Sequence, residues 1–433
     1  MPSIAPKLMA SALAAGLLAL TTALSPAPPA WSAEASTPND MARFLAGLPP
    51  AADSPLASLT KNPTWEQHAR DFDAIFGRED KTRLSKIRAF SQQRLTEKQQ
   101  TMLYMFSGPD FLFAVSFFPN ATTYVLSGLE PVGEVPQLTD LPRPAVDSTL
   151  HNIESSLGSL LSISFFITKN MQTQLESGPA HGTLPILYVF LARTGKTIHD
   201  VSLVNLDADG NIETPPAPGD KTAARKFAES GARGVKIVFS DGNGPNQTLY
   251  YFSTNLADDG VKTSGFLQFC DRLGVADSFF KSASYLLASG GFNRLRNFIL
   301  NRSATIVQDD TGIPITYFDP KKWRLQPFGH YLGPIPEFSS CFQPGMEELF
   351  RRDNPIPIDF GLGYRWRTDE SNLLVAQRIG PIDGSAVSSA LTTVSDAWWG
   401  AAPKNCGGRS PKNETAKASP FSAYWWSRAR PSK

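Results

Sequence analysis

The sequence "FFPNATTYVLSGLEPVGEVPQL" spans Phe117–Leu138, and "YFDPKKWRLQPFGHYLGPIPEF" spans Tyr317–Phe338. The two segments align without a gap, and the elements expected around them follow in the same order. Their main identical pairs are Phe118 with Phe318, Gly133 with Gly333, and Pro136 with Pro336. We interpret the match as an internal duplication; the alternative is that β-strand patterning around Gly-Pro turns arose twice without common descent.

A duplication predicts an α+β protein of two similar halves, each a small, mainly antiparallel sheet with flanking helices. A Pro-rich segment, "ETPPAPGDKT", provides the best internal boundary. The expected divisions are a signal peptide at 1–35, a linker at 36–62, a first half at 63–213, a linker at 214–222, a second half at 223–381 and a disordered tail at 382–433.

Hydrophobic patterning also predicts the individual elements. Helical periodicity indicates helices at 64–78, 81–95, 145–161, 265–291 (as two helices) and 292–303. Aromatic-rich runs broken by Gly, Pro, Asn or Asp indicate hairpins at 101–118, 234–254 and 304–318, and a further strand at 184–194.

The charge balance limits the classes of partner. The 433 residues include 41 Lys and Arg against 40 Asp and Glu, a formal net charge of +1. Such a balance, without a basic run, argues against a nucleic-acid partner. We therefore expect a small-molecule or envelope partner.

The first 35 residues have the pattern of a secretory signal peptide. Lys7 precedes an apolar stretch at 8–24, and "SPAPPAWSAEAS" follows with small residues suited to cleavage after Ser32 or Ala35. A membrane anchor is the alternative, but the immediate Pro-rich sequence disfavours it. The pattern predicts a soluble periplasmic or secreted protein without a transmembrane anchor after cleavage.

Three cysteines allow one disulfide within the chain. We expect Cys270 to pair with Cys341, because Cys406 lies in the tail that is expected to be disordered. The sequence has no C-x-x-C motif or Cys/His cluster, so a structural zinc site is not expected.

Acidic turns supply the first candidate catalytic residues. The duplication aligns Asp110 with Asp310, and "DDTG" at 309–312 is similar to the Asp-Thr-Gly motif of bilobal aspartic proteases. That motif requires apolar residues before the Asp, whereas Gln308 and Asp309 stand there. We therefore favour an acidic hairpin turn and keep Asp110 and Asp310 as candidates.

A serine and a histidine complete the catalytic candidates. Ser107 lies in "FSGPD" and His330 in "PFGHY", both loops with glycine, where catalytic groups often reside. The sequence has no G-x-S-x-G motif. It has no phosphate-binding or nicotinamide-binding glycine motif either.

The segment "NLDADGNIE" resembles the first half of a calcium-binding loop. Asn205, Asp207 and Asp209 offer oxygen ligands at alternate positions, and Gly210 allows the turn. The closing carboxylate is missing, because Pro216 occupies the twelfth position. A polar hairpin turn is the favoured interpretation; no cofactor is expected, with calcium as the alternative.

Aromatic residues are the remaining candidates for ligand binding. Trp323, Tyr331, Phe111 and Tyr364 lie in or near the two repeated segments. Exposed, they would form a platform for a sugar, a lipid or an apolar small molecule. Buried, they belong to a Phe-rich core, which is the favoured interpretation for most of them.

These observations lead to two functional hypotheses. The first is an exported soluble protein that binds a small molecule, sugar or lipid, or serves in the cell envelope. The alternative is an envelope hydrolase that uses loop carboxylates and a histidine. Binding predicts an aromatic-lined cleft, whereas catalysis predicts that perturbed carboxylates converge with a serine or a histidine.

The signal-peptide pattern predicts a mature protein that begins at Ala33 or Ser36, because cleavage follows small residues. N-terminal sequencing of the protein from the periplasm or medium of its host checks this. A chain from the envelope fraction that still begins at Met1 or Pro2 would contradict it.

Overall fold

The computed structural model describes residues 36–135, 137–163, 180–216, 219–223, 227, 231–382 and 406. All of them belong to the unit Ala35–Lys433. The expected signal peptide and nearly all of the expected tail lie outside the described residues.

Ten strands form a single mixed sheet in the order β4-β3-β5-β6-β2-β1-β7-β8-β10-β9. Five neighbouring strands of this sheet run parallel to one another: β6, β2, β1, β7 and β8. The strand pairs on either side of these five are antiparallel. The strands are β1 (Thr101–Tyr104), β2 (Thr123–Gly128), β3 (Lys196–Leu206), β4 (Ile212–Glu213), β5 (Arg233–Asp241), β6 (Asn246–Ser253), β7 (Ala276–Phe280), β8 (Ser303–Gln308), β9 (Trp323–Gly329) and β10 (Asn372–Arg378).

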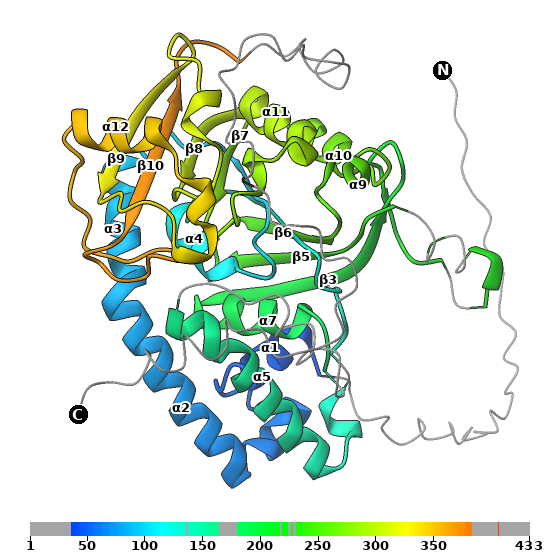
Figure 1. Ribbon diagram of the computed structural model, residues 1–433. Coiled ribbons are helices and arrows are strands. Elements are labelled where there is room, and N and C mark those ends of the chain that lie inside the picture. Colours follow the sequence, from blue (N-terminus) through cyan, green and yellow to red (C-terminus); the bar gives the residue numbers. More distant parts are fainter. Residues whose placement is uncertain are drawn as a thin grey trace, which may run out of the picture. The chain divides into compact units, whose positions relative to one another are not determined.

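Helices cover both faces of this sheet (Figure 1). Residues of α1 to α5 and α7 pack on one face, and residues of α9 to α11 pack on the other. The helices are α1 (Pro38–Leu45), α2 (Pro63–Glu79), α3 (Ser85–Arg94), α4 (Phe111–Phe117), α5 (Arg143–Ile163), α7 (Leu184–Arg193), α9 (Asp258–Val261), α10 (Phe266–Arg272), α11 (Asn293–Arg302) and α12 (Pro344–Arg352). Within the described part of the chain, no helix combines the length and apolar character needed to cross a membrane.

The fold is α+β as expected, but the structure does not show a duplication. One large mixed sheet replaces the two small antiparallel sheets, and strands from both sides of the segment 214–222 join it. The strand of the first repeated segment, β2, pairs directly with the preceding strand β1, whereas β10 separates the strand of the second, β9, from the preceding strand β8. The expectation that the two segments occupy equivalent positions is therefore wrong.

The aligned glycines of the two segments, Gly133 and Gly333, are similar only in their backbone conformation. Gly133 and Gly333 both have left-handed backbones, with φ of 72° and 77°. A β-carbon on Gly133 would lie 1.7 Å from the carbonyl oxygen of His181, whereas one on Gly333 would meet only the Phe342 ring at 3.6 Å. The two glycines thus serve different contacts, and Pro136 lies outside the described residues.

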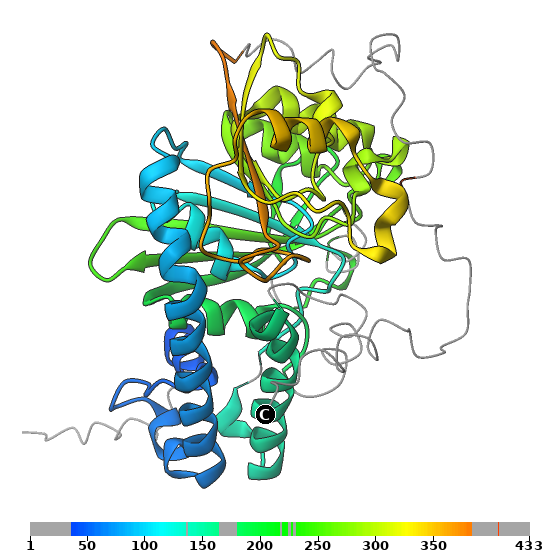
Figure 2. The ribbon, with the colours of Figure 1, turned by 60° about the vertical axis from the view of Figure 1, so that its left-hand side comes forward.

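Amphipathic patterning predicted several helices correctly. The helix expected at 64–78 is α2, with Pro63 in its first turn and Asn62 accepting a hydrogen bond from the Thr64 N–H at 3.1 Å. α2 continues through a π-helical turn, Asp80–Leu84, into α3, and the three form one continuous rod (Figure 2). The hairpin expected at 234–254 is also present, as β5 and β6.

Other elements were assigned wrongly because both of their sides are buried. Residues 101–118 form β1, a loop and α4 instead of a hairpin, and every residue of α4 is buried. The strand expected at 184–194 is α7, also buried almost throughout. The second helix expected within 265–291 is β7, and β8 leads into a loop where a hairpin was expected. Short apolar runs without alternation do not distinguish a buried helix from a buried strand.

A single aromatic cluster illustrates how the sheet holds its helices. The fully buried Phe279 on β7 lies 4.6 Å from the Tyr104 ring and 4.7 Å from the Phe117 ring, centroid to centroid. It therefore joins the central strands to α4.

We expect Phe279→Ala to lower the free energy of unfolding by about 3–5 kcal/mol, because it leaves a cavity between strand and helix. Urea unfolding measures the loss. Phe342→Ala is the matched control; its side chain is 40% exposed, so the loss should stay below about 1 kcal/mol. Equal losses in the two variants would contradict the packing described here.

Candidate functional site

The carboxyl ends of the parallel strands meet at one edge of the sheet, which is where open α/β sheets place their ligand sites. Chemically active side chains follow three of these strands in the structure. Asp110 lies in the loop after β1, Lys281 follows β7, and Asp309 and Asp310 follow β8. The antiparallel strand β10 begins at the same edge with Asn372.

A buried ion pair joins the first two loops. Lys281 Nζ lies 2.6 Å from Asp110 Oδ2, with side chains only 2% and 1% exposed. Asp110 also accepts a hydrogen bond from Tyr104 Oη at 2.9 Å, and its other oxygen caps α4 by accepting from Phe113 N–H at 3.3 Å. The ammonium group lies 3.6 Å from the Phe113 ring centre. Burial lowers the pKa of Lys281, and the Asp110 carboxylate opposes that shift.

Asp309 connects the loop after β8 to the loop after β7. Its Oδ2 accepts a hydrogen bond from Ser282 N–H at 2.8 Å, and its Oδ1 accepts from Thr311 N–H at 3.0 Å and from the Thr311 hydroxyl. The Thr311 oxygen in turn accepts from Ala283 N–H at 2.7 Å. The two loops therefore hold each other in place through backbone donors.

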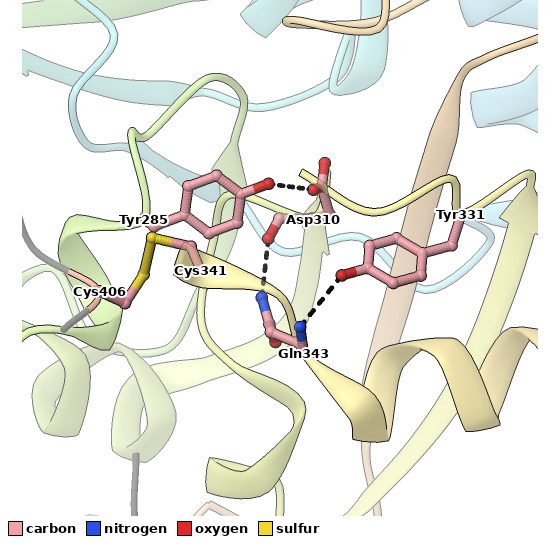
Figure 3. Close-up of a disulfide and its surroundings, with 6 residues drawn as sticks. All are labelled: Tyr285, Asp310, Tyr331, Cys341, Gln343 and Cys406. Atoms are coloured by element: carbon pink, nitrogen blue, oxygen red, sulfur yellow. Dashed lines mark hydrogen bonds between the residues drawn. A yellow bond between two sulfur atoms is a disulfide. The ribbon is translucent and has the colours of Figure 1, made fainter. Parts of the chain in front are cut away.

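Asp310 is held from several sides (Figure 3). Its carboxylate accepts hydrogen bonds from the Tyr285 hydroxyl and from Asn372 Nδ2, the latter at 3.1 Å. The backbone N–H of Asp310 donates to Asn372 Oδ1 at 2.8 Å, and its carbonyl accepts from Gln343 Nε2 at 3.0 Å. Figure 3 shows Tyr285 and Tyr331 on opposite sides of this carboxylate.

Burial disfavours the ionised form of the adjacent carboxyl groups of Asp309 and Asp310. Burial and, secondly, the neighbouring Asp310 raise the pKa of Asp309 to about 7, against the opposing effect of the Thr311 and Ser282 hydrogen bonds. Burial also raises the pKa of Asp310, against hydrogen bonds from Tyr285 and Asn372. Two neighbouring carboxyl groups in a water-poor site do not both ionise readily. The pair therefore retains a proton near neutral pH.

The loops at this edge carry unusual backbone strain. Left-handed φ values occur at Ser282 (55°), Ser284 (52°) and Tyr285 (57°) after β7, and at Phe106 (61°) after β1. Among the described residues only Asn354 is a further non-glycine example. Such conformations cost about 1–3 kcal/mol each and concentrate at functional sites.

Two segments cover the carboxyl pair. Gly363, with φ of 57°, lies so close that a β-carbon there would be 2.3 Å from Asp309 Oδ2. The Phe338 ring packs against Tyr285 at 5.4 Å and Tyr364 at 5.6 Å between centroids. Tyr364 Oη lies 2.8 Å from Ser284 Oγ, which fixes the cover to the strained loop.

A disulfide attaches the distant Cys406 to this cover. Cys341, at the end of the 3-10 helix Pro336–Cys341, bonds to Cys406 with the Cα atoms 4.8 Å apart (Figure 3). The bridge packs with Tyr285. The expected pairing of Cys270 with Cys341 is wrong, because Cys270 is a buried free thiol on α10.

The structure unites some of the candidate residues and separates others. Asp110 and Asp310 both reach this edge. Ser107 donates to the carbonyl of Gly108 at 2.9 Å and accepts from Ser127 N–H at 3.2 Å, so it fixes the β1–β2 connection. His330 is exposed after β9, and no hydrogen bond joins its ring to Ser107 in the described part of the chain.

The aromatic candidates divide in the same way. Trp323 (4% exposed) and Phe111 (0%) are core residues, as the favoured interpretation expected. Tyr331 accepts from Gln343 N–H at 3.3 Å and stacks with Phe342. Together with Tyr364, it borders the carboxyl pair.

The loop at Asn205, for which a polar turn was favoured over a calcium site, is held by protein donors. Asp207 accepts from the backbone and side-chain N–H groups of Asn211, both at 2.7 Å. The Asn205 side chain donates to the Phe227 carbonyl, and the carbonyl of Asp209 accepts from Arg272 at 2.6 Å. Among the described residues, no group of three or more His, Cys, Asp or Glu side chains is arranged to hold a metal ion.

Sequence reasoning did not place Lys281, Ser282, Tyr285 or Asn372 among the site candidates. The available signal was "ADSFFKS", a short apolar run followed by a charged and a polar residue. Read as a strand rather than a helix, it would have placed Lys281 and Ser282 in the loop at the carboxyl end of that strand, where active-site groups are common.

Comparison with known protein families, curated proteins and solved structures found no match in any of the three. The geometry of the site is therefore the basis for any functional proposal.

The buried carboxyl of Asp309 predicts a pH-dependent stability. Its pKa is about 7 in the folded protein and about 3.9 in the unfolded chain, so the folded state holds more protons between these values. This stabilising contribution is complete below pH 4 and is lost as the pH rises through 7. Asp277, whose pKa burial raises to about 6, acts in the same direction.

Asp309→Asn should reduce this loss of stability by up to about 1.4 kcal/mol per pH unit, because its amide does not ionise. Urea unfolding between pH 5 and pH 8 measures the slope, and Asp369→Asn, at an exposed position, is the control. Parallel profiles for the wild type and Asp309→Asn would show that the carboxyl does not titrate in this range.

Proposed function

We propose that the protein is an exported hydrolase that works by acid–base catalysis at the carboxyl edge of its sheet. The observation that carries the proposal is the adjacent buried pair Asp309 and Asp310, whose pKa values are both raised, that of Asp309 to about 7. Acid–base catalysts are most effective when their pKa lies near the working pH. A carboxyl group that titrates near the working pH can donate a proton to a leaving group and take one from a nucleophile.

The neighbouring groups support this role. Tyr285 and Asn372 orient the Asp310 carboxylate, and Ser282 N–H and Thr311 orient that of Asp309. Lys281 places a positive charge near Asp309, which interacts with it electrostatically. Because Lys281 is paired with Asp110 at 2.6 Å, its main part is to hold the loops that carry the carboxyl pair.

Access to the pair requires the cover to move. Asp309 and Asp310 are 3% and 4% exposed, and the turn at Gly363 lies directly against the Asp309 carboxylate. Closure over a reactive site excludes water and is a common feature of enzymes with moving loops. The proposal thus includes an open form in which this turn has moved aside.

Export remains part of the proposal. It rests on the apolar stretch at 8–24 and the small residues that follow it. The bond between Cys341 and Cys406 supports it, because disulfides persist in oxidising compartments such as the periplasm or the medium.

Binding without catalysis is the second candidate function. It is favoured by the apolar surface beside the carboxyl pair, where Leu332 is 57% and Phe342 is 40% exposed and Tyr331 stacks on Phe342. In that case the protein binds a small molecule, sugar or lipid, or an envelope component, and the carboxyl network only fixes the loops.

A panel of p-nitrophenyl esters, phosphates and glycosides tests catalysis. We expect hydrolysis of at least one class, with a pH profile that has an apparent pKa near 7. Asp309→Asn and Asp310→Asn should each lower the rate by about 100-fold or more. Asp369→Asn should retain it.

The outcome separates the two functions. Rates that are unchanged in both carboxyl variants would refute catalysis by the pair and leave binding as the explanation. Thermal unfolding of each variant confirms that a lost rate does not reflect a lost fold.

A further inference from the structure

Ser282 occupies an exceptional position after the central strand β7. It follows Lys281, has a left-handed φ of 55°, and lies at the carboxyl edge of the parallel strands. A strained turn directly after a buried strand raises a side chain above the sheet edge, which is how several hydrolases present their nucleophile. A glycine would adopt the same backbone without strain but has no hydroxyl. The strained serine therefore indicates a chemical role for the Ser282 side chain.

The hydroxyl of Ser282 is buried and has no hydrogen-bond partner within the described part of the chain. Buried hydroxyl groups are normally paired, so this exception requires an explanation. Ser284, two residues later with φ of 52°, has the same backbone strain, but its hydroxyl lies 2.8 Å from Tyr364 Oη. The unpaired hydroxyl of Ser282 is thus not a general consequence of the strained loop.

The Asp309 carboxylate and the Ser282 hydroxyl converge on one point. A β-carbon on Gly363 would lie 2.3 Å from Asp309 Oδ2 and 2.9 Å from Ser282 Oγ. Both oxygens therefore lie against the Gly363 turn, too close to leave room for a side chain there. When the Gly363 turn moves, this point becomes the place where a substrate atom contacts a nucleophile and a base together.

We propose that Ser282 is the nucleophile of the hydrolase and that its substrate is a carboxylic ester; this inference rests on the proposed acid–base function. Ser282 Oγ attacks the carbonyl carbon and its proton passes to the Asp309 carboxylate. The bond to the alcohol then breaks, and the alcohol leaves with that proton. Water next gives a proton to Asp309 and bonds to the carbonyl carbon, and Ser282 oxygen departs with the proton, which releases the acid.

The cations at this edge favour an acyl over a phosphoryl substrate. Phosphoryl transfer depends on cationic groups that clamp the phosphate. Lys281 is paired with Asp110 at 2.6 Å, and Arg365 donates to the Gly333 carbonyl at 3.0 Å and lies 3.6 Å from Glu370. Asp110 holds Lys281, and Gly333 and Glu370 hold the Arg365 terminal nitrogens, whereas a neutral ester needs no cationic clamp.

Labelling with a fluorophosphonate and turnover of p-nitrophenyl acetate test the inference on the full-length protein. We expect one adduct, on the peptide that contains Ser282, in the wild type and in Ser58→Ala, the matched control at an exposed serine. Ser282→Ala and Ser282→Gly should lose the adduct and at least about 100-fold of the ester hydrolysis. Ser58→Ala should stay within about threefold of the wild type, since its hydroxyl is outside the reaction.

Ser282→Gly guards against a folding artefact. Glycine adopts a left-handed backbone without strain, so this variant should unfold at the same or a higher temperature than the wild type while lacking the hydroxyl. A folded, inactive, unlabelled Ser282→Gly protein supports the nucleophile.

The contrary outcomes are distinct from a failure of the proposed function. An adduct on another residue, or ester hydrolysis retained in Ser282→Gly but lost in Asp309→Asn, would overturn the nucleophile and indicate direct attack by water. No labelling of the wild type would also overturn it. Hydrolysis that survives in Asp309→Asn as well would overturn the acid–base proposal itself.

Discussion

The ion pair between Lys281 and Asp110 is the interaction on which this end of the molecule depends. Both side chains are almost inaccessible, and their atoms lie 2.6 Å apart between the loops after β7 and β1. Removing one partner from such a pair leaves an uncompensated buried charge and costs about 3–5 kcal/mol. Because Asp110 also caps α4, the pair fixes a helix as well as two loops. The position of the strained loop that carries Ser282 follows from this constraint.

The edge combines features that each reduce stability. It holds left-handed non-glycine residues, two carboxyl groups that resist ionisation, and a buried hydroxyl without a partner in the described part of the chain. The aromatic core around Phe279 and the disulfide at Cys341 compensate for them. Stability given up at one place in a fold is commonly associated with function there. This concentration, rather than any single residue, distinguishes the carboxyl edge from the rest of the sheet.

The accuracy of the sequence reasoning varied with the surroundings of each element. α2 was predicted because one of its sides faces solvent and gives a helical period, and β5 with β6 because a Gly/Asn turn separates them. α4 and α7 were read as strands because their buried surroundings remove that period. β7 was read as a helix for the same reason. Lys281 and Ser282, which follow it, were therefore not placed at the end of a strand. Asp110 and Asp310 were chosen from an alignment that the strand order does not support, and they reach one edge because β1 and β8 lie on either side of β7.

The sequence by itself determined the α+β composition, the amphipathic helices and the local turns, because these depend on residues close together along the chain. Only the tertiary structure decided that ten strands form one sheet, which cysteine bonds to Cys341, and that Lys281 pairs with Asp110. Strand order and burial depend on contacts between residues distant in the chain. The raised pKa values of Asp309 and Asp310 therefore arise from the exclusion of water by the covering segments, an effect that no local pattern records.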